Sequence, residues 1–189
     1  MLAPRRHFPN PLASRQTAQT GTVGSMTIDR RKFLLAAPAL LAACSGRQLL
    51  SYNGPKVTSI MAFKQQRKMY LLHGNKALKS YPFQLGFTPV GHKQFEGDGK
   101  TPEGTYIIDR RNPNSSYHLS VGISYPNDRD RAFAEAHGKR PGGDIFIHGT
   151  PSDVLGKKDW TAGCIAVTNE EVEEIYAMVG DYTPVFVKA

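Results

Sequence analysis

The feature that most constrains the fold of this chain is a series of short apolar runs, rich in β-branched and aromatic residues. Turns rich in glycine, proline and asparagine separate the runs, as at Gly97-Asp98-Gly99 and Pro141-Gly142-Gly143. We therefore expect a mostly β domain, built as a β-sandwich or mixed sheet with one or two short helices. The expected strands are Val57–Phe63, Arg67–His73, Phe83–Phe87, Tyr106–Ile108, Tyr117–Ile123, Asp144–His148, Cys164–Val167 and Val185–Lys188.

One helix is well specified near the end of the chain. Thr168 is followed three residues later by Glu171, which is the spacing of a capping box. Gly180 supplies a stop signal, and the stretch Arg129–His137 is a candidate for a second short helix. Between the cap and the stop, apolar residues recur at the helical spacing i, i+3, i+4 and i+7: Val172, Ile175, Tyr176 and Val179.

The net charge of +8 is unevenly distributed along the 189 residues. Residues 1–43 hold six basic residues and one acidic residue, and the remainder holds 18 basic and 15 acidic residues. The body of the protein is therefore nearly balanced in charge, with neither a basic run nor a basic stripe interleaved with aromatic residues. This pattern argues against a nucleic-acid partner.

The N-terminal region has the order of features of a bacterial export signal. Arg30 and Arg31 precede an apolar stretch over residues 33–43, which is too short to cross a bilayer core of about 30 Å as a helix. The paired arginines resemble a twin-arginine signal. The stretch ends in Leu41-Ala42-Ala43-Cys44, which resembles a lipobox and implies that Cys44 receives lipid and becomes the new N-terminus. We expect an exported lipoprotein anchored to the periplasmic face of a membrane.

These signals divide the chain into three parts. Residues 1–43 are expected to be a leader and signal peptide, and Met26 is a candidate for the true start because residues 1–25 fit neither a signal nor a fold. Residues 44–56 are expected to contain the lipidated cysteine and a tether, and residues 57–189 are expected to form the folded domain.

Cys164 is the candidate nucleophile. If Cys44 carries lipid, Cys164 is the only thiol left in the mature chain. Gly163 directly precedes it, and a glycine there allows a turn that exposes the sulfur and directs the backbone N–H groups of Gly163 and Cys164 inward. A lone cysteine is more often a small buried hydrophobic residue, so the interpretation depends on a partner base.

His148 is the candidate base. It ends an apolar strand and is followed by Gly149, so its ring is expected at the mouth of that strand. An imidazole beside a thiol favours the thiolate, which is the attacking species.

Together these residues resemble the L,D-transpeptidase catalytic domain (YkuD) family, whose signature is a His-Gly pair, a loop and a Gly-Cys nucleophile. Here 15 residues separate His148 from Cys164. Gly97–Tyr106, Ser124–Asn127 and Pro141–Ile145 are also similar to the family. The resemblance covers residues 57–188 and implies acyl transfer on peptidoglycan stem peptides, with Cys164 as nucleophile and His148 as proton acceptor and donor. It implies no cofactor.

The motif departs from the family's commoner form. Thr161 and Ala162 stand in place of Ser-His, and Ala166 stands in place of an Arg or Asn. This variant, with Trp160 before it, is more similar to the YafK-like branch, which includes an amidase that releases a lipoprotein from peptidoglycan. Amidase activity of the same fold and a catalytically inactive wall-binding lipoprotein therefore remain open as alternatives.

The other histidines and acids point to no further site. The remaining histidines show neither an i, i+4 pair nor an HExxH motif, so no metal site is expected. Asp98 and Glu103 lie in a turn rich in glycine and proline, where we expect them to fix backbone geometry.

Overall fold

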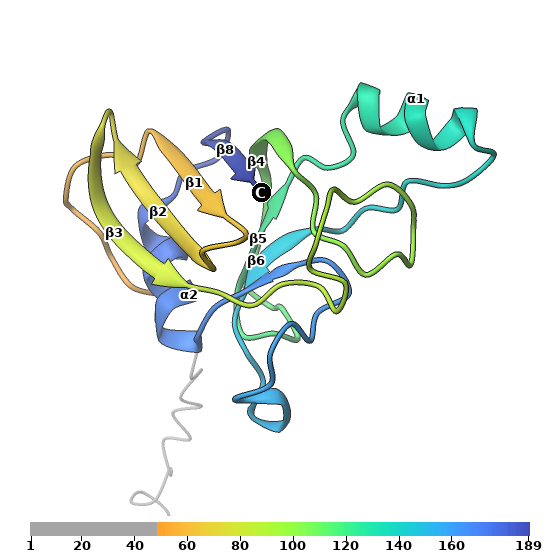
Figure 1. Cartoon of the computed structure of the whole chain (residues 1–189). Helices are drawn as coiled ribbons and strands as arrows, with labels where there is room; N and C mark the ends of the chain where they lie inside the picture. The colour runs from red at the N-terminus through yellow and green to blue at the C-terminus, as the bar shows by residue number, and fades with distance from the viewer. Residues whose placement is uncertain (1–48) are drawn as a thin grey trace, which may run out of the picture. The chain divides into compact units, whose positions relative to one another are not determined.

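An eight-stranded mixed sheet forms the body of residues 49–189, the part of the chain that the computed structural model describes (Figure 1). The strand order is β3-β2-β1-β8-β4-β5-β6-β7. The pairs β1–β8 and β6–β7 are parallel, and the other neighbours are antiparallel. The strands are β1 (Ser59–Phe63), β2 (Lys68–His73), β3 (Lys76–Pro82), β4 (Gly104–Asn112), β5 (Ser120–Ile123), β6 (Phe146–His148), β7 (Ile165–Ala166) and β8 (Pro184–Lys188).

The sheet curls at β4, which is its longest strand. The first half of β4 pairs with β8 along Gly104–Ile107, and its second half pairs with β5 along Ile108–Asn112. The register shifts between Ile108 and Arg110, and such a bulge bends a strand and increases its twist. The strands β5, β6 and β7 therefore turn away from β1, β2 and β3. The prediction of a mostly β, mixed-sheet domain with one or two short helices is confirmed, and residues 49–189 contain two α-helices.

Helix α2 (Asn169–Met178) covers one face of the sheet (Figure 1). The capping box foreseen from the sequence is present: Glu171 N–H donates to Thr168 Oγ1 at 3.2 Å, and Thr168 N–H donates to Glu171 Oε2 at 2.9 Å. The apolar side of the helix joins the core through Val172, Ile175, Tyr176 and Met178.

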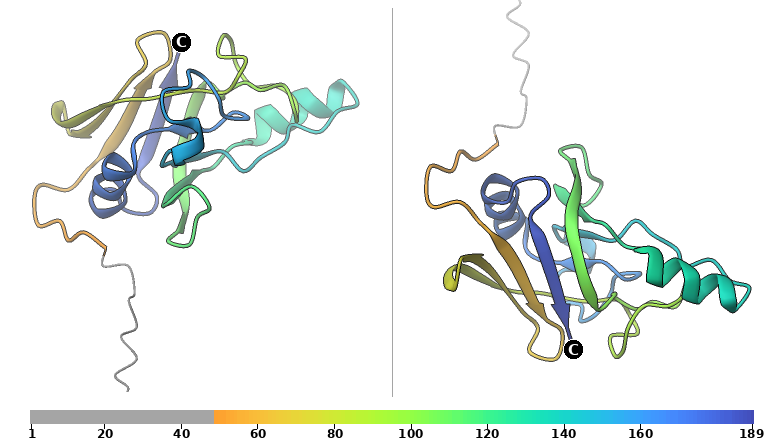
Figure 2. Two further views of the ribbon diagram at one scale, coloured as in Figure 1. Left: turned by 90° about the horizontal axis from the view of Figure 1, so that it is seen from below. Right: turned by 90° about the horizontal axis from the view of Figure 1, so that it is seen from above.

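Helix α1 (Asp128–Ala136) projects from the body of the domain (Figure 2). Its first turn is held by Asp130, which is 6% exposed and accepts hydrogen bonds from Asn127 N–H and the Tyr106 hydroxyl. His92 Nδ1 accepts from Glu103 N–H at 2.9 Å, so Nε2 carries the ring proton and donates to Asp130 at 3.1 Å. The helix predicted for this region is present, one residue earlier than expected.

Three segments differ from the expected strands. Lys76–Pro82 was not foreseen, because five of its seven residues are exposed and an edge strand of this kind has no apolar alternation. Phe83–Phe87 is not a regular strand and makes only two isolated bridges, Gln84 with Ala166 and Gly86 with Thr161. The strand expected from Tyr117 starts at Ser120, because His118 has a φ of 73° that interrupts extended structure.

The predicted leader, the paired arginines and Cys44 lie outside the described residues. Of the predicted tether, Tyr52 packs against the core. Within residues 49–189, no helix has the length and apolar character needed to span a bilayer.

Candidate active site

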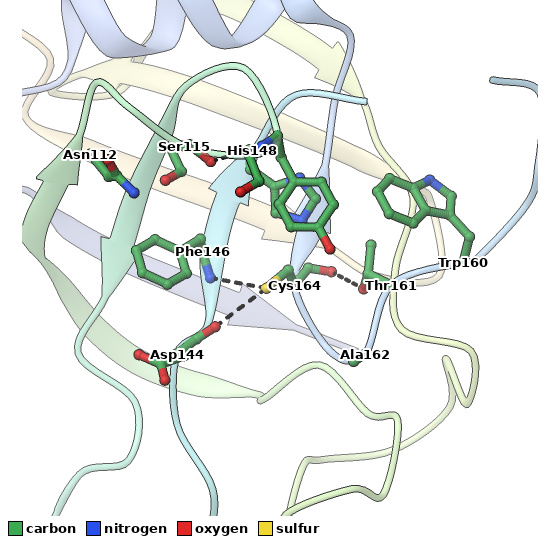
Figure 3. A pocket seen from close by; sticks show the side chains of 12 residues that line it. Asn112, Ser115, Asp144, Phe146, His148, Trp160, Thr161, Ala162 and Cys164 are labelled. Carbon is green, nitrogen blue, oxygen red and sulfur yellow. Dashed lines mark hydrogen bonds between the residues drawn. The ribbon is translucent and has the colours of Figure 1, made fainter. Parts of the chain in front are cut away.

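A cavity of about 520 Å³ opens beside the ends of β6 and β7 and is lined by the predicted nucleophile Cys164 and the predicted base His148 (Figure 3). Its walls come from segments distant in the sequence: the end of β4, the approach to β5, the strand β6 and the turn before β7. The lining residues are Asn112, Ser115, Ser116, Tyr117, Ser120, Asp144, Phe146, His148, Trp160, Thr161, Ala162 and Cys164.

Strand pairing brings Cys164 and His148 to the same cavity. In the parallel pair β6–β7, Ile147 lies opposite Ile165, so Cys164 lies one residue before this contact, beside Phe146. Phe146 and His148 are two residues apart on β6 and line the cavity, whereas Ile147 between them is fully buried in the core.

A tight turn over Thr161–Cys164 presents the thiol. Gly163 has a φ of 132°, and a Cβ at this position would lie 2.6 Å from the carbonyl oxygen of Lys100, so a side chain would clash there. The Thr161 hydroxyl accepts from Gly163 N–H at 3.1 Å and donates to the Cys164 carbonyl at 2.8 Å. The Thr161 hydroxyl therefore stabilises the turn by bonding to two of its backbone groups.

The sulfur of Cys164 has two backbone neighbours, both drawn in Figure 3. Phe146 N–H donates to Sγ at 3.4 Å, and the thiol donates to the carbonyl oxygen of Asp144 at 3.4 Å. Burial raises the pKa of the Cys164 thiol, and the N–H of Phe146 opposes part of this shift. Cys164 therefore rests as a neutral thiol at neutral pH, with one donor already directed at the atom that must carry negative charge.

His148 is held in one tautomer. Its Nδ1 lies 2.7 Å from the carbonyl oxygen of Gly149, and a carbonyl can only accept, so Nδ1 carries the proton. Nε2 is thereby left as the basic nitrogen. Burial lowers the pKa of His148 more than the bond to Gly149 raises it. The imidazole is therefore neutral at neutral pH and able to accept a proton.

Two aromatic side chains surround the imidazole. Tyr117 stacks on His148 with ring centroids 4.5 Å apart, and Trp160 meets His148 nearly edge-on at 5.6 Å. The rings of Tyr117 and Trp160 are 5.9 Å apart. The sequence alone did not identify Tyr117 as a site residue; the only available signal for Trp160 was its position four residues before Cys164.

Asp144 lines the cavity, and Arg110 contacts two of the lining residues, Phe146 and Asp144. The Arg110 guanidinium lies 4.5 Å over the ring of Phe146, and its Nη2 is 3.4 Å from Oδ1 of Asp144. The Asp144 side chain is 92% exposed. The cavity therefore presents one solvated carboxylate to an incoming ligand, and the Arg110 guanidinium pairs with Asp109 and Asp144 beside it.

The structure qualifies one predicted role. The N–H of Gly163 is bound to Thr161 Oγ1, so it would have to leave this partner before it could bind an oxyanion. The oxyanion role of Gly163 stays a prediction.

The other histidines within residues 49–189 have structural partners away from the cavity. His73 and His137 bond to backbone carbonyls of Lys56 and Phe133, and His118 pairs with Glu173 at 2.6 Å. Among residues 49–189, no three histidine, cysteine or acidic side chains are grouped as metal ligands.

Asp98 fixes backbone geometry, as expected. Its carboxylate accepts the N–H groups of Gln94, Phe95 and Lys100 and pairs with Lys93 Nζ at 2.9 Å.

Comparison with known proteins agrees with this geometry. YafK of Escherichia coli (strain K12) is 34% identical over 126 residues, covering 64% of this chain and 46% of YafK. The helical cell shape determining protein Pgp2 from Campylobacter jejuni is 27% identical, with a TM-score of 0.56 over 75% of this chain and 51% of Pgp2. Bd1075 of Bdellovibrio bacteriovorus is 25% identical, with a TM-score of 0.50 over 73% of this chain and 50% of that chain.

This chain thus spans about half the length of the relatives it matches. The family model of the L,D-transpeptidase catalytic domain, YkuD, matches residues 58–187, which include both Cys164 and His148. The chain belongs to the L,D-transpeptidase catalytic domain family.

Proposed function

We propose that the protein is a peptidoglycan L,D-transpeptidase in which Cys164 carries out acyl transfer on a stem peptide. The observation that carries the proposal is the shared cavity, which contains a thiol, a neutral imidazole with Nε2 as its basic atom, and a backbone N–H directed at the sulfur. Membership of the family supplies the substrate class. The bond attacked is the amide between diaminopimelate, or a similar residue, and D-alanine.

The first half-reaction forms a thioester. Sγ of Cys164 attacks the carbonyl carbon while Nε2 of His148 takes the thiol proton, and the carbonyl electron pair moves onto oxygen. The carbonyl re-forms as the C–N bond breaks, and the imidazolium gives its proton to the leaving D-alanine nitrogen. The second half-reaction returns the thiol: an amine or water gives a proton to His148 and attacks the thioester, and the departing sulfur takes that proton back.

The neutral resting state of both groups fits this scheme. The proton that leaves sulfur is the one that the leaving amine needs, so the pair must hold one proton in total to complete a cycle. Phe146 N–H stabilises the sulfur as charge develops on it. The N–H groups of Cys164 and Gly163 are the proposed oxyanion donors.

The experiment is incubation with purified muropeptides followed by mass spectrometry. Loss of D-alanine with formation of a cross-linked dimer supports transpeptidation, and loss of D-alanine without a dimer supports hydrolysis. The Cys164→Ala variant is the control, because it removes the nucleophile and leaves the cavity wall in place. If this variant processes the stem peptide at the wild-type rate, the mechanism is wrong.

We also propose export as a lipoprotein, on the basis of Arg30, Arg31 and the Leu41–Cys44 sequence. Cys44→Ala should release the protein from the membrane fraction or stall its processing, with activity in vitro retained. Replacement of both arginines by lysine should block export by the twin-arginine route. Normal membrane association of Cys44→Ala would overturn the lipid anchor, and normal export of the double variant would point to the general secretory route.

The cell wall is the setting that these features support. Pgp2 determines helical cell shape in Campylobacter jejuni, and wall remodelling of that class is the role that we propose for this protein at the periplasmic face of a membrane.

A further inference from the structure

The loop between His148 and Cys164 is tied to the hairpin of β1 and β2 by an ion pair. Nη2 of Arg67 lies 2.6 Å from Oδ2 of Asp159, across 92 positions of sequence, and the two side chains are 26% and 12% exposed. Both residues have a left-handed backbone conformation, with φ values of 52° for Arg67 and 47° for Asp159. Glycine fits this backbone region most easily, and a long side chain such as arginine is uncommon there. The uncommon conformation is that of Arg67, and it accompanies the ion pair with Asp159.

Hydrogen bonds on both sides of Trp160 connect the same loop to the extended segment Gln84–Phe87. Leu85 N–H donates to Asp159 Oδ1 at 3.2 Å, and Asp159 N–H donates to Gln84 Oε1 at 3.1 Å. On the other side, Thr161 N–H donates to the Leu85 carbonyl at 3.1 Å, and Phe87 N–H donates to the Thr161 carbonyl at 2.9 Å. The residues before and after Trp160 are therefore both fixed.

Trp160 itself has no polar anchor. Its Nε1 is buried and, within residues 49–189, has no hydrogen-bond partner. The ring contacts His148 and Tyr117 and separates the cavity of Cys164 from a second cavity of about 380 Å³ that Arg67 also lines. Figure 3 shows the indole beside the imidazole at the edge of the site. Its position is therefore set by packing and by its fastened neighbours.

We propose that Arg67 and Asp159 are positioning residues of the active site, whose ion pair holds Trp160 against His148 and keeps water away from the imidazole and the thiol. This inference rests on the proposed function only where it predicts a change in turnover. The predicted changes in Trp160 emission and in thiol reactivity do not depend on the substrate. The titratable side chains that face the cavity with His148 are Tyr117, Asp144 and Cys164.

Two features of the sequence allow a direct test. Trp160 is the only tryptophan of the chain, so its emission reports this wall alone. The chain has two cysteines, so in a full-length Cys44→Ala background Cys164 is the only thiol, and its alkylation by iodoacetamide can be followed against pH. Asp159→Asn is the main variant, because asparagine tolerates the left-handed conformation and keeps an acceptor for Leu85 while removing the charge.

In Asp159→Asn we expect red-shifted Trp160 emission, greater quenching by acrylamide, and a Cys164 alkylation profile moved to lower pH, because water relieves the burial that raises the thiol pKa. With muropeptide as substrate, kcat should fall about tenfold with a smaller change in KM. Arg67→Lys, which keeps the charge and loses the planar fork, should give intermediate shifts.

Glu174→Gln is the matched control, since it removes a carboxylate that pairs with Lys79 at 3.0 Å on the far part of the sheet. Its emission and alkylation profile should equal those of the parent. If Asp159→Asn and Arg67→Lys, folded by circular dichroism, also keep the parent's emission, quenching and alkylation profile, the positioning role is overturned whatever their turnover. Absence of turnover in the parent would overturn the proposed function and leave this test valid.

Discussion

The part of the domain around β1, β2, β8 and α2 is packed by apolar side chains, whereas the part around the cavity also contains buried polar side chains bonded to backbone. Ile60, Leu71, Ile175 and Val185 are fully buried in the first region. On the cavity side, apolar residues such as Ile147 and Ile165 are also fully buried, and buried lysines, threonines and a histidine lie among them. His148 and Thr161 line the cavity, and Lys64, Lys93 and Thr101 are buried polar residues bonded to the loop after residue 87 or within it.

The loop after residue 87 is an example of a segment held by buried polar side chains that bond to the backbone. Nζ of Lys64 donates to the carbonyls of Gly91 and Thr101 and to Glu103 Oε1, at 2.6, 2.9 and 2.8 Å. Burial lowers the pKa of Lys64, and its bond to Glu103 opposes this shift. Directional bonds of this kind fix a loop at one geometry, which apolar contacts alone do not do. The difference indicates that one region supplies stability and the other supplies the placement of reacting atoms.

Cys164→Ser is expected to have the largest effect on activity and little effect on stability, which separates the roles of the two regions. Turnover of muropeptides should fall almost to zero, because a hydroxyl is far harder to deprotonate than a thiol and His148 is neutral and weakly basic. The thermal unfolding midpoint should stay within a few degrees of the wild type, since one atom changes in a cavity wall. A serine variant with wild-type turnover would contradict the nucleophile assignment.

His148→Ala comes next in size. Loss of the general base should slow the formation of the acyl-enzyme by about 10²- to 10⁴-fold. The rate is measured as the appearance of thioester-modified protein by mass spectrometry after rapid mixing. His73→Ala is the control, because His73 is exposed and bonds only to the Lys56 carbonyl. Equal rates in the two variants would remove His148 from the mechanism.

The pH dependence of kcat/KM should show a wide plateau. Burial lowers the pKa of His148 below the ordinary value of about 6.5, so the acid limb should lie below that pH, where protonation of Nε2 removes the base. Burial raises the pKa of the Cys164 thiol, so the alkaline limb, where the proton needed by the leaving amine is lost, should lie above the ordinary thiol value. An acid limb centred above the ordinary histidine value would contradict the buried, neutral imidazole.

The stability of the apolar region is tested by Leu71→Ala, which should cost about 2–5 kcal/mol in the free energy of unfolding. Leu71 is fully buried in β2, so its removal leaves a cavity in the core. The activity per folded molecule should not change. Leu155→Ala is the matched control. Leu155 lies in the loop between His148 and Cys164 and is 64% exposed, so its replacement should cost about 0.5 kcal/mol or less in the free energy of unfolding. Similar losses in both variants would contradict the division between the regions.

The apolar region was also the easier one to predict from the sequence. Local sequence patterns predict its strands and α2. These patterns are the alternation of apolar and polar residues, the capping box of Thr168 and Glu171, and the apolar spacing along the helix. Cys164 and His148 were identified because their spacing along the chain is short and typical of the family. Strand β3 was missed because it is a polar edge strand.

The supports of the site could not be predicted because they are long-range and polar. Arg67 meets Asp159 across 92 positions, and Lys64 meets Glu103 across 39. In sequence, each of these side chains is typical of a solvated surface. Tyr117 reaches His148 only because the approach to β5 folds over the end of β6, a consequence of sheet topology that no local pattern encodes.

Thr168→Ala is expected to change stability by the smallest amount. It tests whether the helix cap and the position of the thiol are independent of each other. The Thr168 hydroxyl accepts from Glu171 N–H at the start of α2, and its removal should cost about 1 kcal/mol in the free energy of unfolding. Only two residues separate the end of β7 at Ala166 from the start of α2 at Asn169, so a rigid connection would transmit the change from the helix to Cys164. We expect no such coupling, because the Thr161 hydroxyl and the backbone bonds to Leu85 and Phe87 hold the cysteine turn independently. The alkylation profile of Cys164 against pH should therefore match that of the wild type while the unfolding midpoint in urea falls. A shift in both would show that the helix cap, and not the polar network, sets the position of the thiol.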